Sequence, residues 1–335
     1  MKKSLITLIL VVMLAASIIQ TSLAASGTKY EAEPNNTYSQ ATRTYNDYDN
    51  YGYISSSGEV DWWVVSFPVA GAANFWLGNI PSNCDYELYV YLPGGTVVLG
   101  SSTNGGNNPE LFSINIAANT NYYIRIHSYS GYSTSSQYLM RTKFYPSLDV
   151  PLLAQGANDT CGAANTRQML HYYGYDYLTE TNVINKFRDL TKKEEQYKNW
   201  YEISGVINYY AYGHSLKQYW RIDYPNITVN DFRDRIYNCL IQDKPLIILV
   251  IVPIDDEFPG YYNYSIYPNL GYIPYESEGH YLTISGISTD GTTLIIKDTW
   301  GGSVGTSGTR YVPVATLKDY GHGTNGELNI ISYYW

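Results

Sequence analysis

The segment Thr160–Gly174, TCGAANTRQMLHYYG in one-letter code, is the most informative part of the chain. Small and apolar side chains recur along it at helical spacing, and Gly174 suits the left-handed position at which a helix ends. Asp159 or Thr160 is a natural N-cap, which leaves Cys161 in the first turn. There the helix dipole and the unpaired backbone N–H groups stabilise a thiolate, the reactive form of cysteine. A buried first-turn cysteine fits this local pattern equally well.

Three other residues surround Cys161 with the groups that a nucleophile needs. Gln155, six residues earlier, has a side-chain amide that can donate to an oxyanion together with the Cys161 backbone N–H. His280 begins an expected strand, and Asp298 ends the next one after a tight turn. Such a hairpin places both at the same end of neighbouring strands, where Asp298 can orient the imidazole and the imidazole can take the thiol proton. Leu246–Val252 is expected to be a central buried strand beside them.

As a set, these motifs resemble papain-fold cysteine peptidases, and among them the double-glycine-peptidase-like family, over about residues 149–335. The motifs are Gln155-x5-Cys161-Gly162-x-Ala164, Gly279-His280-Tyr281 and Asp298-x-Trp300-Gly301. The resemblance implies an α+β papain-like catalytic domain over residues 146–335. It also implies that Cys161 is the nucleophile, His280 the base, Asp298 the orienting group and Gln155 the oxyanion donor.

Four residues are expected to contact the substrate: Gly162, Trp300, Tyr261 and Tyr262. Gly162 leaves room for a substrate to approach Cys161. Tyr261 and Tyr262 belong to a stretch of 27 residues before His280 that is rich in Tyr, Pro and Gly. Loops of more than about 15 residues are usually functional or disordered. A wall of the substrate cleft and an unstructured insertion are therefore both possible for this stretch.

The preceding region, residues 28–145, is predicted to be an all-β sandwich, because short alternating or aromatic-rich runs are separated by turn residues. The expected strands are Trp62–Phe67, Tyr86–Leu92, Leu111–Ile116, Tyr122–His127 and Tyr138–Phe144. The motifs Glu33-Pro34-Asn35-Asn36, Gly58-Glu59-Val60-Asp61-Trp62-Trp63 and Asp85–Tyr91 resemble the bacterial pre-peptidase C-terminal domain, a jelly-roll-like sandwich. That resemblance implies a module that binds a substrate or a surface, such as extracellular matrix or the cell wall.

Calcium is a further expectation from this resemblance, since collagen-binding relatives of the module hold Ca²⁺ with acidic and amide side chains of the leading segment. Ca²⁺ takes six to eight oxygen ligands. A solvated acidic strand entry is the alternative reading, and no cofactor is expected for catalysis. The residues that match are Glu31, Glu33, Asn35 and Asn36, with Asp61 or Glu59 as a later ligand.

Residues 1–24 have the pattern of a secretory signal peptide. Lys2 and Lys3 precede the apolar stretch Leu5–Ile19, and Ser22-Leu23-Ala24 has the small-x-small form of a cleavage site. No later segment is long and apolar enough to span a membrane. The mature protein is therefore expected to be secreted. Of the three cysteines, Cys84 and Cys239 are expected to be small buried hydrophobic residues.

Composition and missing motifs exclude several other functions. The chain of 335 residues has a net charge of 21 − 30 = −9, which argues against nucleic acid as a partner. It contains no His-Glu-x-x-His motif, no paired cysteine motif and no Gly-x-Ser-x-Gly elbow, so a zinc hydrolase or an α/β-hydrolase is disfavoured.

The sequence thus predicts a secreted cysteine peptidase acting on a protein or peptide. Two alternatives stay open. The first is a thiol-dependent amidase, isopeptidase or transglutaminase acting on cell-wall or protein cross-links, which the same four groups would serve. The second is a non-catalytic adhesion protein, and the complete set of four catalytic groups argues against it.

Overall fold

The computed structural model describes residues 26–157, 160–191, 200–211, 218–223, 227–250, 280–300, 307–320 and 327–332. They divide into two compact units. The first holds the residues up to Phe144 apart from two short segments, Pro68–Ala72 and Asn115–Ala118, which group with the second unit from Tyr145 onward. No helix among the described residues is long and apolar enough to cross a membrane.

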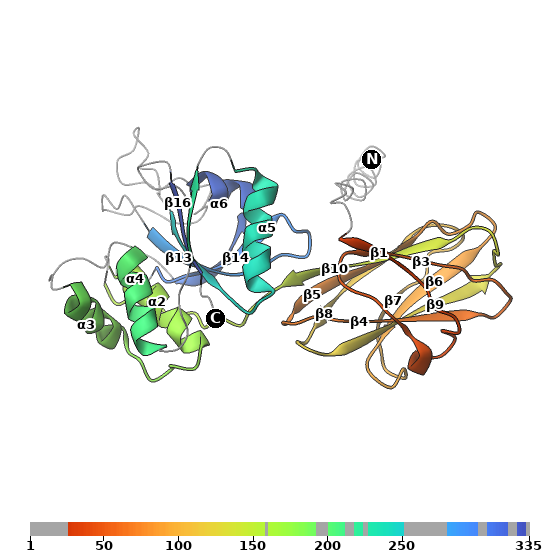
Figure 1. Cartoon of the computed structure of the whole chain (residues 1–335), viewed down its shortest axis with the longest axis horizontal. Coiled ribbons are helices and arrows are strands. Elements are labelled where there is room, and N and C mark those ends of the chain that lie inside the picture. Colours follow the sequence, from red (N-terminus) through yellow and green to blue (C-terminus); the bar gives the residue numbers. More distant parts are fainter. Residues whose placement is uncertain are drawn as a thin grey trace, which may run out of the picture. The chain divides into compact units, whose positions relative to one another are not determined.

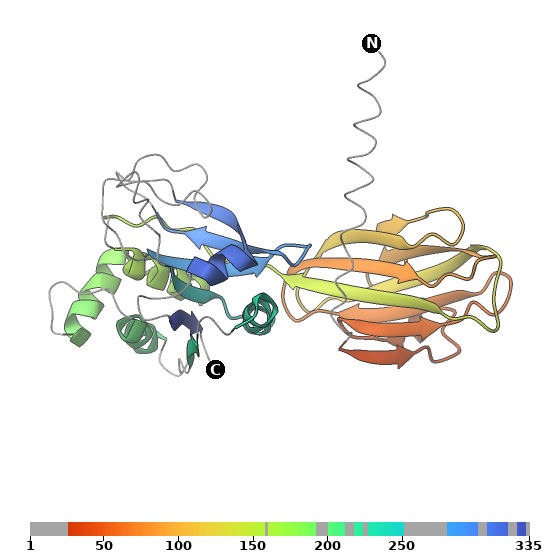
Figure 2. The same cartoon turned by 90° about the horizontal axis from the view of Figure 1, so that it is seen from above.

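The first unit is a sandwich of two five-stranded sheets (Figures 1 and 2). One sheet has the order β1-β3-β10-β5-β8, formed by Gly27–Tyr30, Tyr48–Gly52, Tyr138–Pro146, Gly71–Gly78 and Glu110–Ile116. The other has the order β2-β4-β9-β6-β7, formed by Thr42–Arg43, Val60–Ser66, Asn121–Ser130, Asp85–Tyr91 and Val98–Ser102. A short 3-10 helix, η1, covers Tyr38–Gln40.

The core of the sandwich joins its two sheets through large aromatic side chains. The indole Nε1 of Trp63 in β4 donates to the hydroxyl of Tyr138 in β10 at 3.0 Å. Phe67 and Phe144 are in ring contact at 4.9 Å between centroids. Because strands from both sheets contribute to one buried layer, the all-β sandwich expected from the sequence is confirmed.

All five strands expected in this unit are present, as β4, β6, β8, β9 and β10. The other five were not predicted. β5 contains Gly71-Ala72-Ala73-Asn74, residues with low strand propensity, yet its alternate residues Ala73, Phe75 and Leu77 are fully buried. β7 is an edge strand without a buried residue, so it has no apolar pattern to detect.

The second unit is an α+β structure around one antiparallel sheet with the order β11-β16-β12-β13-β14-β15. Its strands are Gln218–Asp223, Glu327–Ser332, Leu246–Val250, His280–Ile287, Thr293–Asp298 and Gly308–Pro313. Its helices are α2 (Cys161–Tyr172), α3 (Glu180–Thr191), α4 (Trp200–Tyr210), α5 (Val229–Leu240) and α6 (Val314–Tyr320). β12 lies third in the sheet, which confirms the central buried strand predicted there.

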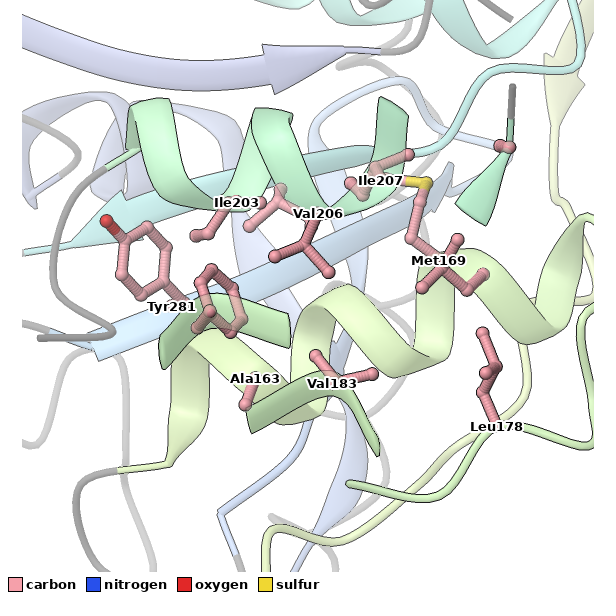
Figure 3. Packing of buried hydrophobic residues seen from close by; sticks show 12 residues of the cluster. Ala163, Met169, Leu178, Val183, Ile203, Val206, Ile207 and Tyr281 are labelled. Atoms are coloured by element: carbon pink, nitrogen blue, oxygen red, sulfur yellow. The ribbon is translucent and has the colours of Figure 1, made fainter. Parts of the chain in front are cut away.

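Helices cover both faces of this sheet, and therefore every residue of β13 is buried. On one face, Ile247 of β12 and Tyr281 of β13 join side chains of α2, α3 and α4 in a single core (Figure 3). Alternate residues of the strands point the other way, toward α5, whose Phe232 and Ile236 are fully buried.

The segment after β10 is bound to the sheet of the second unit. The backbone N–H of Leu148 donates to the carbonyl oxygen of Ser285 in β13 at 2.8 Å. Val150 is 1% exposed. This segment therefore leads directly to Gln155.

Helix α2 begins at Cys161, as the sequence predicts. Thr160 is its N-cap residue, but the Thr160 hydroxyl donates to the carbonyl oxygen of Ala157 at 3.0 Å and makes no capping hydrogen bond to the helix. Gly174, with φ of 88°, follows the helix end in the left-handed conformation expected of it. Cys84 and Cys239 are buried free thiols, as expected.

Candidate active site

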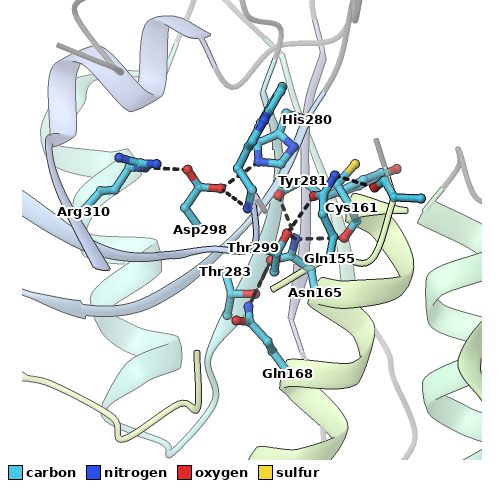
Figure 4. A network of polar contacts seen from close by, with 12 residues as sticks. Gln155, Cys161, Asn165, Gln168, His280, Tyr281, Thr283, Asp298, Thr299 and Arg310 are labelled. Carbon is cyan, nitrogen blue, oxygen red and sulfur yellow. Dashed lines mark hydrogen bonds and ion pairs between the residues drawn. The ribbon is translucent and has the colours of Figure 1, made fainter. Parts of the chain in front are cut away.

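Cys161, His280 and Asp298 meet at one end of the sheet of the second unit (Figure 4). Cys161 is the first residue of α2, His280 the first of β13 and Asp298 the last of β14. Thr283 pairs with Lys297, so His280 and Asp298 lie diagonally across neighbouring strands. His280 Nε2 lies 2.9 Å from Asp298 Oδ1, and Cys161 lies close enough to His280 for each side chain to shift the pKa of the other. The imidazole therefore interacts with both the thiol and the carboxylate.

The electrostatics of this group favour charge separation. Burial alone would raise the pKa of Cys161, but the hydrogen bond and positive charge of His280 outweigh it and hold that pKa below its ordinary value. Burial alone would lower the pKa of His280, but the hydrogen bonds and negative charges of Asp298 and Cys161 raise it to about 9. Both shifts stabilise a thiolate–imidazolium pair.

Asp298 is fully buried and accepts hydrogen bonds from three directions. Its Oδ1 accepts from His280 Nε2 and from the backbone N–H of Trp300, each at 2.9 Å. Its Oδ2 accepts from Nε of Arg310 in β15. Burial would raise the pKa of Asp298, but the hydrogen bond and charge of His280 and the charge of Arg310 hold it below its ordinary value. The carboxylate is thus fixed in its ionised form.

Gln155 is 3% exposed and lies beside Cys161 in Figure 4. Its backbone N–H donates to the carbonyl oxygen of Thr299 at 2.8 Å, and its side-chain Oε1 accepts from the Thr299 hydroxyl at 3.2 Å. Its Nε2 donates to the carbonyl oxygen of Ala157 at 2.9 Å. Thr299 therefore fixes both the backbone and the amide orientation of Gln155 next to the triad.

A buried polar network continues from Thr299 into helix α2. The side-chain Nδ2 of Asn165 donates to Thr299 Oγ1 at 3.1 Å, to the carbonyl oxygen of Tyr281 at 2.7 Å and to that of Cys161 at 2.9 Å. Its Oδ1 accepts from the Thr283 hydroxyl at 2.6 Å. One amide thus holds α2, β13 and the end of β14 together around Cys161 and His280.

Four residues of this site were not predicted from the sequence: Thr299, Arg310, Asn165 and Glu180. Glu180, at the start of α3, accepts from the backbone N–H of Gly156 at 2.9 Å and so anchors the loop between Gln155 and Cys161. Of these four residues, only Thr299 could have been identified from the local sequence, because it stands between Asp298 and Trp300. The others depend on strand register and helix packing.

The structure describes two of the four residues that were predicted to contact the substrate, Gly162 and Trp300. Gly162 is buried in the first turn of α2, where its carbonyl oxygen accepts from the Thr166 hydroxyl. Trp300 is 4% exposed and packs edge-on against the His280 ring, with centroids 4.3 Å apart. Tyr261 and Tyr262 lie outside the described residues. Contact of these four with a substrate stays a prediction.

The acidic residues of the first unit also come together. Glu31, Glu33 and Asp61 can place one carboxylate oxygen each within 4.8 Å of one another. Asn35 is fully buried, and one terminal atom of its amide lies 3.3 Å from Asp61 Oδ1 and 3.2 Å from Glu33 Oε1. An amide nitrogen at that position donates to both carboxylates. The three carboxylates offer oxygen ligands of the kind that Ca²⁺ takes.

The other two predicted ligands are not part of this cluster. Asn36 is exposed, beside the loop Ser56–Val60. Glu59 accepts from the backbone N–H groups of Ser55 and Ser56, at 2.5 and 2.8 Å. Without a cation, burial and the charge of Glu31 raise the pKa of Asp61 to about 9.

The chain matches one known family and shows fold-level similarity to several solved structures. The model of the Peptidase_C39 like family matches residues 147–320. Xylellain, a cysteine protease from Xylella fastidiosa, is 13% identical, with a TM-score of 0.34 and coverage of 57% of this chain and 86% of its own. The pre-peptidase C-terminal domain of collagenase from Bacillus anthracis is 14% identical, with a TM-score of 0.27 and coverage of 31% and 94%. A family 35 carbohydrate binding module from Clostridium thermocellum is 14% identical, with a TM-score of 0.21 and coverage of 27% and 75%. No curated protein matches the chain.

Proposed function

The chain belongs to the Peptidase_C39-like family of cysteine-type peptidases, and we propose that it hydrolyses peptide bonds with Cys161, His280 and Asp298, using Gln155 as an oxyanion donor. The observation that carries this proposal is that Cys161, His280 and Asp298 converge at the meeting point of α2, β13 and β14, with His280 Nε2 2.9 Å from Asp298 Oδ1. The nucleophile, the base and the orienting group come from three separate elements, and a fourth group, Gln155, is fixed beside them by Thr299.

In the first half of the proposed reaction, the Cys161 thiolate attacks the carbonyl carbon of the scissile bond. The developing oxyanion receives hydrogen bonds from the Cys161 backbone N–H and from Gln155 Nε2. The imidazolium of His280 gives its proton to the leaving nitrogen, and the C–N bond breaks. The products are a free amine and a thioester on Cys161, with His280 neutral.

In the second half, a water molecule attacks the thioester while the neutral His280 takes its proton. The C–S bond breaks, the carboxylic acid product leaves, and the thiolate–imidazolium pair is restored. Asp298 keeps the imidazole in the tautomer and orientation that both halves need.

New peptide termini are the product that distinguishes this proposal from its alternatives. We expect the full chain to cleave members of a synthetic peptide mixture, as detected by mass spectrometry, and the variant Cys161→Ala to cleave none. The variant Cys239→Ala is the matched control, because it removes a buried thiol outside the site. Release of ammonia or amine without new termini would favour the amidase or transglutaminase reading. Full activity of Cys161→Ala would contradict the assignment.

We further propose that the protein is secreted, supported by the export pattern of residues 1–24, and that its sandwich unit binds a substrate or a surface. The same unit would hold Ca²⁺ with Glu31, Glu33 and Asp61, and the buried side chain of Asn35 lies beside these carboxylates. This cation would be structural. It would neutralise carboxylates that otherwise lie close to one another, the fully buried Asp61 among them.

A further inference from the structure

Arg310 reaches the catalytic carboxylate from the far side, away from His280. It stands in β15 opposite Ile296 of β14, and Gly308 stands opposite Asp298. Arg310 and Asp298 are therefore diagonal neighbours on one face of the sheet, a separation that a long side chain can bridge. Its Nε donates to Asp298 Oδ2, while His280 and Trp300 donate to Oδ1. Figure 4 shows the guanidinium and the imidazole on opposite sides of the carboxylate.

This placement matters because the two positive partners of Asp298 behave differently during the proposed reaction. His280 is charged in the thiolate–imidazolium state and neutral once its proton has gone to the leaving amine. A guanidinium does not lose its proton in proteins, so the charge of Arg310 is constant. Asp298 is fully buried, whereas the Arg310 side chain is 20% exposed.

Without a second cation, the thioester state would leave a buried carboxylate next to a neutral ring. Burial of that carboxylate favours its protonated form. A bare carboxylate would also bind a proton on His280 more tightly, and an imidazolium does not act as a base. Either outcome removes the neutral, oriented imidazole that must take a proton from water.

We propose that Arg310 is a positioning residue that keeps Asp298 ionised while His280 is neutral, and so supports hydrolysis of the thioester. This inference rests on the proposed function, since it concerns the second half of the same reaction. Arg310 acts through Asp298 and touches neither substrate nor sulfur.

p-Nitrophenyl acetate separates the two halves without knowledge of the natural substrate. Acetylation of Cys161 releases a burst of p-nitrophenolate equal to the active thiol, and the steady-state rate then reports thioester hydrolysis. For Arg310→Gln we expect a full burst, a steady-state rate lower by about tenfold or more, and a KM that falls with it. For Arg310→Lys, which keeps the charge but changes its geometry, we expect a full burst and a smaller loss. Intact mass should show acetylated enzyme accumulating in both variants.

Lys297→Gln is the control, because Lys297 carries a positive charge on β14 but donates to Thr309, and it should behave as the unmodified chain. A steady-state rate of Arg310→Gln equal to that of Lys297→Gln would overturn the inference. It would also be overturned if folded Arg310→Gln lost burst amplitude and steady-state rate to the same extent. If Arg310→Gln does not fold, Arg310→Met takes its place, and a steady-state rate equal to that of Lys297→Gln then overturns the inference. If the unmodified chain releases p-nitrophenolate no faster than Cys161→Ala, the proposed function is refuted, and this inference with it.

Discussion

The imidazole of His280 sets the pH range of the proposed reaction. The thiolate–imidazolium pair forms as pH rises through the lowered pKa of Cys161 and is lost as pH rises through the His280 pKa of about 9. We expect kcat/KM to follow a bell-shaped profile between these limits. Asp298→Asn removes the charge that raises the His280 pKa, so the alkaline limb should move to lower pH. An alkaline limb that stays in place in this variant would contradict the assigned role of Asp298.

Gln155 is expected to matter for turnover and not for formation of the thiolate. Gln155→Ala removes the proposed oxyanion donor, so kcat should fall by about 100-fold or more. The rate at which iodoacetamide alkylates Cys161 should stay unchanged, since Gln155 is not among the groups that shift the thiol pKa. Gln242→Ala, which removes an exposed amide on α5's C-terminal side, serves as the control. A kcat within about threefold of the control would count against the role of Gln155.

The places of individual residues in the candidate site were predictable where the evidence was local. Cys161 was predicted from its place at the start of a helix. His280 and Asp298 were predicted from their places as the first and last residues of one β-hairpin. Arg310 and Asn165 were not predicted. The contact of Arg310 with Asp298 depends on the pairing of β14 with β15, which no pattern in the sequence specifies. Asn165 reads as an ordinary polar residue inside a helix, and only its packing against β13 reveals its role.

Among the contacts between helices and strands, those of the Asn165 side chain should contribute most to the free energy of unfolding. Asn165→Leu would leave the carbonyl oxygen of Tyr281 and the hydroxyls of Thr283 and Thr299 without this buried partner. We expect the free energy of unfolding to fall by about 2–4 kcal/mol, measured by urea denaturation. Thr166→Val, which removes one buried hydroxyl bond within α2, should cost about 1 kcal/mol. Equal losses in the two variants would show that the network has no special role.

Element prediction succeeded where burial leaves a strong pattern. The apolar run at β12, the hairpin of β13 and β14, and the aromatic strands of the sandwich were all expected. β3, β5 and β7 were missed, because each contains Gly together with Asn or Ser, residues of low strand propensity, and pairing with neighbouring strands stabilises them. In such segments long-range pairing outweighs intrinsic strand propensity.

For the molecule as a whole, the two units should respond separately to Ca²⁺. The raised pKa of Asp61 means that the folded sandwich binds more protons than the unfolded chain, so its stability falls as pH rises from about 4 toward about 9. A cation that replaces those protons should raise the Tm of one calorimetric transition, and more so at pH 8 than at pH 5, within that range. Asp61→Asn should abolish the effect. A Tm unaffected by Ca²⁺ at both pH values would remove the metal proposal.

The central claim is that His280 and Cys161 form a thiolate–imidazolium pair, and the rate of Cys161 alkylation by iodoacetamide at about pH 6 tests it most directly. An ordinary cysteine, with a pKa of about 8.5, is almost entirely protonated there. Intact mass should show one label on Cys161, added at least about tenfold faster in the unmodified chain than in His280→Ala. Buried Cys84 and Cys239 should stay unlabelled. Equal alkylation rates in the two proteins would contradict the account.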